Sequence, residues 1–529
     1  MAPPQPGSSL PRMSRLRLLL AVPLLSVVAV GCGASTQRRA LVPTSVPATS
    51  PPTTVPLTTA PPTTVPPAVA RPGSPNIVFV LTDDLSDNLV TPQLMPNLWS
   101  LEHAGTVFSH YFVTDSLCCP SRASILTGRY PHDTGVFTNN GPDGGINAFN
   151  SRGDQYSTVA TDLHAAGYRT AIMGKYLNLY QPHDPPAPGW DDWAVTGNQG
   201  YGEFNYDLNQ NGRLVHYGGP AGPQDNYLTD VLSGLADGFI RTSVTGRRSP
   251  FFLEVATYAP HSPYTPAPRD AGLYPRLRYP RTPAFDRSNT AAPGWLAREP
   301  PLTARTDALI DESWRKRAQS VKSVDDMIGR LIATLRRVGA WDNTYLVFSS
   351  DNGYHMGEHK LRPGKLTAFD TDINVPLVVV GPHVPHAATV AALTANIDLR
   401  PTFDEWAGTE PGEAIDGRSL GPLLLDRSLT AGWPSAVLVE HHGPDGDPKD
   451  PDYPALDSGN PTSYEALRTA DGLYVEYADG EREYYDLATD PYERHNVYRR
   501  LGAGAVARLH AELVAGEQCR DRPDCLGGP

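Results

Sequence analysis

Short apolar segments alternate with amphipathic segments between residues 76 and 380. Runs rich in β-branched and aromatic residues predict strands, over residues 76–82, 169–173, 251–258, 344–349 and 375–380. Apolar positions at helical spacing predict helices, over residues 95–105, 154–166 and 311–338. This alternation predicts an α/β fold in which helices cover a mostly parallel sheet.

The pattern changes toward the C-terminus. Two short apolar runs, at 472–477 and 483–487, flank an Asp-Gly turn, which predicts a β-hairpin, and a helix is predicted over 505–515. We therefore expect a smaller α+β subdomain over residues 431–529, following a larger α/β domain over residues 76–430.

Two long stretches, at 181–227 and 259–305, are rich in Pro, Gly and Tyr. We expect both to form loops over the functional site. Loops of this kind are where the choice of a ligand is usually encoded, because they tolerate sequence change better than the scaffold does.

The first 82 residues contain no Asp or Glu, which sets them apart from the rest of the chain. Three arginines precede an apolar run over 18–30, which is too short to span a bilayer and is typical of a secretory signal peptide, here over residues 1–31. The run ends in a small residue followed by Cys32, which resembles a bacterial lipobox and predicts a lipid anchor on Cys32. A cleaved signal with an incidental cysteine is the alternative.

Residues 32–75 have the composition of a spacer. Eleven prolines fall between positions 41 and 75, and each removes a backbone donor and fixes one backbone angle. Such a segment cannot form a core and predicts an extended, semi-rigid linker. Together with the signal it predicts an exported protein, either anchored to a membrane at the cell surface or secreted.

The charge of the chain narrows the range of partners. The formal charge is −13, and six of the 44 basic residues lie before Asp83, which leaves 38 basic against 57 acidic residues in the remainder. An acidic balance argues against a nucleic-acid binder, which normally presents a basic face. Cysteine usage agrees with export, since Cys519 and Cys525 are spaced to close a small disulfide loop in an oxidising compartment.

Polar side chains directly follow two of the predicted strands. Asp83 and Asp84 come after the strand at 76–82, and Asp351 and Asn352 come after the strand at 344–349. Ligands of open α/β sheets bind beyond the carboxyl ends of the strands, so both pairs are candidates. Three converging carboxylates repel one another unless a cation lies between them, and oxygen ligands suit Ca²⁺ or Mg²⁺. The alternative for each pair is an ordinary turn or helix cap.

Cys118 and Cys119 form an adjacent pair that needs its own explanation. Pro120 suits the first turn of a helix, so Cys118 is predicted at a helix N-terminus, where free N–H groups favour an anion. Arg122, one turn along, is placed to grip a sulfate or phosphate. A buried thiol pair or a strained vicinal disulfide is the alternative.

The sequence Cys118-Cys119-Pro120-Ser121-Arg122 resembles the sulfatase signature C-x-P-S-R. The resemblance extends over roughly residues 75–500 and includes the Asp83-Asp84 strand end, the Gly-Lys-Tyr at 174–176, the Ala-Pro-His-Ser-Pro at 259–263, the Asp-Asn-Gly at 351–353 and the closing segment 483–497. Several of these segments are similar to the N-acetylglucosamine-6-sulfatase branch. The resemblance implies an alkaline-phosphatase-like fold and a sulfatase activity on a sulfated sugar or an aryl sulfate.

The resemblance also implies roles for individual residues. Cys118 would be oxidised to formylglycine by a formylglycine-generating enzyme, and its hydrate would be the nucleophile. Ca²⁺, with Mg²⁺ as the alternative, would be held by Asp83, Asp84, Asp351, Asn352 and the residue made from Cys118. Arg122, Lys175 and Lys365 would neutralise the sulfate, and His261 or Lys365 would protonate the leaving oxygen. Lys360, the other lysine after Asn352, is interpreted as a solvated side chain.

Two further positions depart from the common sulfatase pattern. A histidine that many sulfatases carry shortly after Gly-Lys is missing, and Asn178 is predicted to take its place in substrate binding. His355 is a candidate base for sulfate release, against the alternative of an ordinary loop histidine.

Two rival functions remain at this point. A phosphodiesterase or phosphonate monoester hydrolase of the same superfamily would use a similar nucleophile. A surface lipoprotein that binds sulfated ligands without turnover belongs to a different class. The acidic balance would repel a long polyanion, so a small or terminal sulfate ester is the expected substrate.

Overall fold

The computed structural model describes residues 70–526, apart from 220–225, 248, 430–431, 456, 523 and 525. The predicted signal peptide, the lipid anchor at Cys32 and nearly all of the spacer lie outside the described residues and stay predictions. Cys519 is disulfide-bonded, whereas Cys525, its predicted partner, is not among the described residues.

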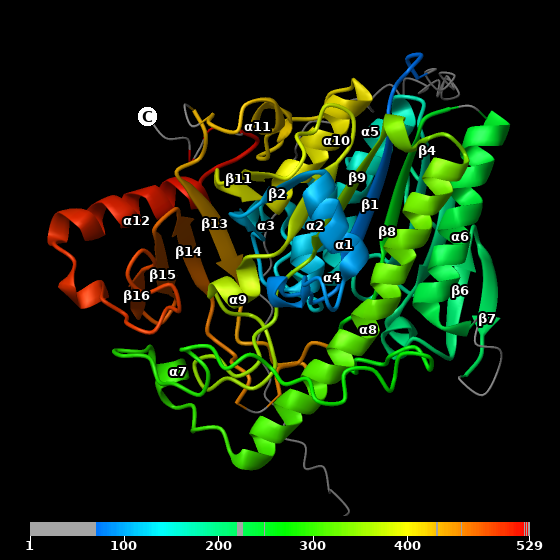
Figure 1. The fold of residues 1–529 in the computed structure, drawn as a ribbon. Coiled ribbons are helices and arrows are strands. Elements are labelled where there is room, and N and C mark those ends of the chain that lie inside the picture. The colour runs from blue at the N-terminus through cyan, green and yellow to red at the C-terminus, as the bar shows by residue number, and fades with distance from the viewer. Residues whose placement is uncertain are drawn as a thin grey trace, which may run out of the picture. The chain divides into compact units, whose positions relative to one another are not determined.

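A ten-stranded sheet forms the centre of the molecule, in the order β11-β2-β10-β9-β1-β8-β4-β5-β6-β7 (Figure 1). Its strands are β1 (Asn76–Thr82), β2 (Thr106–Phe108), β4 (Arg169–Lys175), β5 (Asp192–Thr196), β6 (Tyr206–Gln210), β7 (Arg213–Tyr217), β8 (Phe251–Ala256), β9 (Thr344–Ser350), β10 (Leu377–Val380) and β11 (Ala388–Val390). The five central strands, from β9 to β5, run parallel, and antiparallel partners flank them on both sides. The α/β fold with a mostly parallel sheet is therefore confirmed.

Helices cover both faces of this sheet, because the central strands are apolar on both sides. In β1, Ile77, Phe79 and Leu81 belong to one buried cluster, and Val78 and Val80 belong to another. The longer helices are α1 (Pro96–Ala104), α2 (Cys118–Thr127), α4 (Gly145–Arg152), α5 (Val159–Ala165), α6 (Leu228–Thr242), α8 (Ala304–Arg337) and α10 (Leu399–Ala407). Helices α1, α6 and α8 pack together on one face, and α2, α5 and α10 on the other.

Helix α8 is longer than the sequence pattern predicts. It begins at Ala304 rather than near residue 311, since the side chain of Thr303 accepts a hydrogen bond from the backbone N–H of Thr306 and caps the extra turns. Its long diagonal course across the sheet is visible in Figure 1.

The prediction of a loop over residues 181–227 was wrong in part. Strands β5, β6 and β7 lie there and extend the central sheet. The sequence signal is weak because β7 is a largely exposed edge strand, so its residues show no buried apolar face. Residues 259–303 contain one short helix, α7 (Gly294–Ala297), and otherwise follow the loop prediction, which extended to residue 305 and so included the start of α8.

A second, antiparallel sheet follows the central one in sequence. It consists of β13 (Ala436–His441), β14 (Tyr464–Thr469), β15 (Gly472–Tyr477) and β16 (Arg482–Asp486), and α12 (Ala503–Glu517) packs against it. The predicted hairpin and C-terminal helix are confirmed, while the boundary of a separate subdomain stays a prediction. The remaining short elements are β3 (Tyr111–Phe112), α3 (Pro131–Thr134), α9 (Asp370–Ile373), β12 (Thr394–Ala395) and α11 (Gly421–Leu425). Within the described part of the chain, none of the helices has the length and apolarity needed to cross a membrane.

Candidate active site

The carboxyl ends of β1 and β9 bring four of the five predicted metal ligands to one place. The two strands are parallel neighbours, with Thr82 opposite Ser350, so the residues that follow them emerge side by side. The backbone N–H of Asp84 donates to Oδ1 of Asp351 at 3.1 Å, and Nδ2 of Asn352 donates to Oδ1 of Asp84 at 2.7 Å. All four side chains are buried, as the strand-end argument predicts.

Cys118 is the first residue of α2 and faces this group of carboxylates. Its Sγ lies 3.2 Å from Oδ1 of Asp83 and 4.0 Å from Oδ1 of Asp84. Burial, together with Asp452 and Asp83, raises the pKa of the Cys118 thiol well above its ordinary value. An unmodified thiol at this position is therefore protonated, which makes it a poor nucleophile.

Arg122 lies one turn along α2 and is also buried. Its Nε donates to Oδ2 of Asp351 at 2.8 Å, and its Nη1 donates to the carbonyl oxygen of Lys175 at 3.2 Å. Its Nη2 is buried without a hydrogen-bond partner. A buried, unpartnered guanidinium N–H is costly, so this atom is available to an anionic ligand.

Two lysines supply positive charge near Cys118. Lys175, the last residue of β4, places Nζ 2.6 Å from Oδ2 of Asp83, and Lys365 places Nζ 2.6 Å from Oδ1 of Asp84 and 2.8 Å from the Sγ of Cys118. Burial alone would lower the pKa of both ammonium groups, but the neighbouring carboxylates raise both pKa values well above the ordinary value. Both side chains are therefore charged.

The backbone geometry at position 174 explains why a glycine precedes Lys175. A Cβ atom at this position would lie 1.9 Å from the carbonyl oxygen of Ala256 on the neighbouring strand β8, and the backbone φ is +113°. Only glycine allows this close approach without strain. The motif thus places the lysine by backbone geometry.

His261 completes the group of cationic side chains. Its Nδ1 donates to the carbonyl oxygen of Ser262 at 2.6 Å, and its Nε2 lies 2.6 Å from Oδ1 of Asp452 and 3.5 Å from Oδ2 of Asp84. Burial would lower the pKa of His261, but Asp84 and Asp452 raise it to about 9. The imidazole therefore holds a proton on Nε2, where it can be donated.

Asp452 is the main residue that the sequence argument missed. Its Oδ1 accepts from both His261 and Lys365, at 2.6 and 2.8 Å, and its Oδ2 accepts from Nδ2 of Asn139 at 2.7 Å. It lies in a segment without regular structure between β13 and β14, so no strand end pointed to it. The only signal available was the concentration of aspartates at 445–457.

Arg317, in the middle of α8, is a second missed residue. It is fully buried, and its guanidinium donates to the carbonyl oxygens of Asp84 at 2.5 Å and Pro260 at 3.3 Å. Asp84 has a backbone φ of +62°, in the left-handed region that costs energy for a residue with a side chain. Arg317 stabilises this turn and the start of the loop that carries His261.

The two remaining predicted residues are placed differently. Asn178 lies behind the site, with Nδ2 3.5 Å from the hydroxyl of Tyr201, whose ring packs against His261 with 4.4 Å between ring centroids. His355 hydrogen-bonds Asp372 through Nδ1 and the carbonyl oxygen of Ser458 through Nε2. With both nitrogens engaged, His355 is not brought into the cluster, and the geometry favours the ordinary loop histidine.

The donor set fits a hard divalent cation. Ligand atoms of Asp83, Asp84, Cys118 and His261 all lie within 4.8 Å of one another, and Oδ1 of Asn352 is buried without a partner. Oxygen-rich, carboxylate-rich sites of this kind suit Ca²⁺ or Mg²⁺. His261 lies at the edge of this group, with Nε2 closer to Asp452 (2.6 Å) than to Asp84 (3.5 Å), and we keep its predicted assignment to the reaction.

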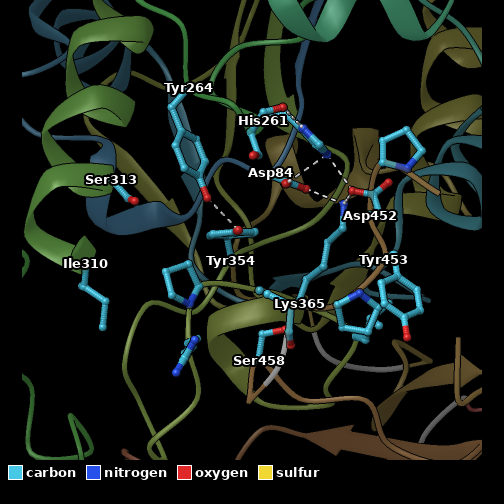
Figure 2. Close-up of a pocket in the computed structure, with 18 of the residues that line it drawn as sticks. Asp84, His261, Tyr264, Ile310, Ser313, Tyr354, Lys365, Asp452, Tyr453 and Ser458 are labelled. Atoms are coloured by element: carbon cyan, nitrogen blue, oxygen red, sulfur yellow. Dashed lines mark hydrogen bonds and ion pairs between the residues drawn. The ribbon is translucent and has the colours of Figure 1, made fainter. Parts of the chain in front are cut away.

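A cavity of about 340 Å³ opens from this cluster (Figure 2). Asp84, His261 and Lys365 lie at its inner end, and Asp452 lies beside them. Figure 2 shows Tyr264 and Tyr354 on the opposite wall, where their hydroxyl groups are 2.8 Å apart. A charged inner end with a partly aromatic wall suits a small molecule that carries an anionic group at one end.

Comparison with known proteins agrees with this geometry. The sulfatase family model matches residues 75–409, and a model described as the C-terminal part of N-sulphoglucosamine sulphohydrolase matches residues 357–518. Human N-acetylglucosamine-6-sulfatase is 35% identical over 483 residues, which cover 85% of this chain and 86% of that protein. The extracellular sulfatase SULF-1 homolog of Drosophila melanogaster is 36% identical over 71% of this chain and 34% of that protein.

The fold also matches that of a solved structure. It is described as a complex with its substrate D-glucosamine-2-N,6-O-disulfate, is 25% identical, and superposes with a TM-score of 0.67 over 83% of this chain and 96% of that chain.

Proposed function

The chain belongs to the sulfatase family and is a sulfuric ester hydrolase, and we propose that it cleaves the sulfate ester of a sugar or an aryl alcohol at the cluster around Cys118. The observation that carries this proposal is the convergence on Cys118 of carboxylates fit for a metal ion and of cations fit for a sulfate. Asp83 lies 3.2 Å from its Sγ, and Lys365 lies 2.8 Å from it.

The proposed nucleophile requires a modified Cys118. After oxidation of Cys118 to formylglycine and hydration, one hydroxyl group would attack sulfur, and the second would later expel sulfate and restore the aldehyde. A formylglycine-generating enzyme is the implied partner. Ca²⁺, held by Asp83, Asp84, Asp351, Asn352 and the modified residue, would supply positive charge that lowers the pKa of the attacking hydroxyl.

The cationic side chains bind and neutralise the sulfate. Lys365 contacts Cys118, Lys175 contacts Asp83 beside it, and Nη2 of Arg122 is buried without a hydrogen-bond partner. Fixed charges in a buried site cost no reorganisation when negative charge moves during the reaction. His261, which holds a proton on Nε2, protonates the leaving oxygen, with Lys365 as the other candidate donor.

We also propose that the protein acts outside the cell. Relatives that are named extracellular sulfatases support export. The apolar run at 18–30, Cys32 and the Pro-rich spacer support a lipid anchor that holds the enzyme off a membrane surface, with secretion as the alternative.

Two measurements test the proposal. Mass spectrometry of the peptide that carries Cys118 should show the aldehyde, and the purified enzyme should hydrolyse an aryl sulfate. Cys118→Ala should abolish this activity, by about a thousandfold or more, whereas Cys119→Ala, the matched control one position along, should retain it. Loss of activity in the second variant with retention in the first would overturn the assignment.

The same preparation separates the rival functions. Faster turnover of a phosphodiester or phosphonate monoester than of the aryl sulfate would favour the phosphoester enzyme. Tight binding of sulfated ligands by protein that carries the aldehyde, without turnover of any ester, would favour the non-catalytic lipoprotein.

A further inference from the structure

The aromatic ring of Tyr201 lies against two of the residues that are proposed to act on the sulfate ester. Nζ of Lys175 lies over the ring, 5.0 Å from its centroid, and the imidazole of His261 packs beside it with 4.4 Å between ring centroids and an interplanar angle of 46°. Tyr201 is 8% exposed, so these contacts are shielded from water. One ring therefore contacts a group proposed to neutralise the sulfate and a group proposed to protonate the leaving oxygen.

A second tyrosine, Tyr258, fixes the position of Tyr201. The two rings meet edge to face, with 5.0 Å between centroids and an interplanar angle of 82°, which is a favourable arrangement for aromatic pairs. The hydroxyl of Tyr258 donates to the carbonyl oxygens of Thr196 and Gly197, at 2.8 and 2.9 Å. These carbonyl groups directly precede the short helical turn Asn198–Gly202, which carries Tyr201. The ring of Tyr201 is therefore held by its own turn and by its neighbour.

Lys175 has few other contacts that could hold its side chain. Among the described residues, its ammonium group has one ion-pair and hydrogen-bond partner, Oδ2 of Asp83 at 2.6 Å. Asp83 is also a proposed metal ligand, so this carboxylate serves two positive charges. The face of an aromatic ring attracts a cation, and the attraction is stronger where water is excluded. Tyr201, with the ring of Tyr258 at 5.9 Å, thus supplies a second restraint on Lys175.

Ordinary core packing is the alternative role for Tyr201. The residue belongs to the buried apolar cluster on the α8 side of the central sheet. Packing requires a side chain of suitable size and shape, whereas attraction of a cation also requires negative charge on the face of the ring. The two roles therefore respond differently to a change in the charge of the ring at constant size.

We propose that Tyr201 is a positioning residue of the active site, whose ring holds the ammonium group of Lys175 and fixes the orientation of the His261 imidazole. The proposal rests on the proposed sulfatase function. Tyr201 acts through these two residues rather than by contact with the ester, so its contribution is to the alignment of the groups that meet the sulfate.

Two substitutions separate the ring of Tyr201 from the rest of the side chain. Tyr201→Phe keeps the ring and should keep kcat/KM for an aryl sulfate within about twofold of the parent value. Tyr201→Leu removes the ring and should lower kcat/KM about tenfold or more, and it should raise the inhibition constant of inorganic sulfate severalfold, because Lys175 is held less well. Unchanged kcat/KM in Tyr201→Leu, or an equal loss in Tyr201→Phe, would overturn the proposal.

Fluorinated phenylalanines at position 201 distinguish the charge of the ring from its packing. Each added fluorine withdraws charge from the ring face and changes its size little. From phenylalanine through the mono-, di- and trifluoro side chains, kcat/KM should therefore fall stepwise, by severalfold in total, at an unchanged melting temperature. The same series at Tyr206 is the control and should show no trend, since that buried ring stacks on Tyr217. A flat series at position 201, or equal trends at both positions, would overturn the contact with the cation.

Failure of this inference is distinguishable from failure of the proposed function. Parent protein that carries the aldehyde at position 118 and hydrolyses no sulfate ester would contradict the function itself. Parent protein that hydrolyses an aryl sulfate, while the substitutions at Tyr201 leave kcat/KM unchanged, would contradict the role of Tyr201 alone.

Discussion

Oδ1 of Asp452 lies 2.6 Å from Nε2 of His261, although the two residues are 191 positions apart in the chain. The same oxygen lies 2.8 Å from Nζ of Lys365. One carboxylate from the C-terminal part of the chain thus fixes the positions of both candidate proton donors. The active site is therefore complete only when the segment between β13 and β14 is in place.

Removal of the Asp452 charge should impair turnover. In Asp452→Asn, His261 and Lys365 lose their shared anionic acceptor, so we expect kcat to fall about tenfold or more with an aryl sulfate. Asp452→Glu should recover part of the loss. Asp445→Asn, in the same segment but outside the cavity lining, is the control, and an unchanged kcat in Asp452→Asn would contradict the positioning role.

Removal of metal should lower both activity and stability. Asp83, Asp84 and Asp351 place three buried carboxylates at one point, so loss of a bound divalent cation leaves mutual repulsion. We expect a chelator to abolish aryl sulfate hydrolysis and to lower the melting temperature by several degrees, and Ca²⁺ to restore both. Asp351→Asn should lose the Ca²⁺-dependent shift in melting temperature. A melting temperature that changes with neither the chelator nor Ca²⁺ would contradict the metal site.

Gly174 should not tolerate a side chain. Gly174→Ala places a Cβ atom 1.9 Å from the carbonyl oxygen of Ala256 at a φ of +113°, so β4 must shift and carry Lys175 with it. The backbone strain alone is about 1–3 kcal/mol, and we expect loss of most activity together with a lower melting temperature. Gly234→Ala is the control, since that exposed position on α6 has open space around it and should be neutral or slightly stabilising. Full activity in Gly174→Ala would show that the close approach is dispensable.

Glu203 should make stability depend on pH. Burial raises the pKa of Glu203 to about 8, although hydrogen bonds from the backbone and hydroxyl of Thr229 oppose the shift. Because the folded pKa exceeds the ordinary value of 4.5, the stability that this carboxyl contributes is full below about pH 4.5 and is lost as the pH rises through about 8.

Thermal denaturation of Glu203→Gln checks this sign. The variant should gain several degrees in melting temperature over the parent at about pH 9 and little at about pH 5. Exposed Glu410→Gln is the control and should show no such difference. A gain in melting temperature at about pH 5 but not at about pH 9 would contradict a raised pKa of Glu203.

Sequence patterns predicted those parts of the site that regular elements position. Asp83 and Asp351 were identified because each follows a buried strand, whereas Lys175 was identified through the Gly-Lys-Tyr segment of the family resemblance, and the structure shows that it ends strand β4. Asp452 was missed because it lies in a segment without periodicity. Arg317 was missed because a charged residue within an amphipathic helix normally faces water, and its complete burial becomes visible only when α8 is packed against the loop that carries Pro260.

The lack of a clear sequence pattern also explains why the loop prediction over residues 181–227 was wrong in part. The edge hairpin β6–β7 consists of two five-residue strands, of which β7 is largely exposed, so the stretch gave no clear pattern of buried positions and was assigned to a loop. The central strands were predicted because burial on both faces requires apolar residues at almost every position.

Helix α8 contributes both to the lining of the cavity and to the support of the metal-ligand turn at Asp84. Leu309 borders the cavity mouth, and Arg317, eight residues further along the same helix, holds the carbonyl oxygen of Asp84. At 1.5 Å per residue the two points are only about 12 Å apart on a single continuous rod. Because Leu309 and Arg317 belong to one continuous helix, a ligand that displaced α8 at the cavity would also displace the guanidinium that holds the left-handed turn at Asp84.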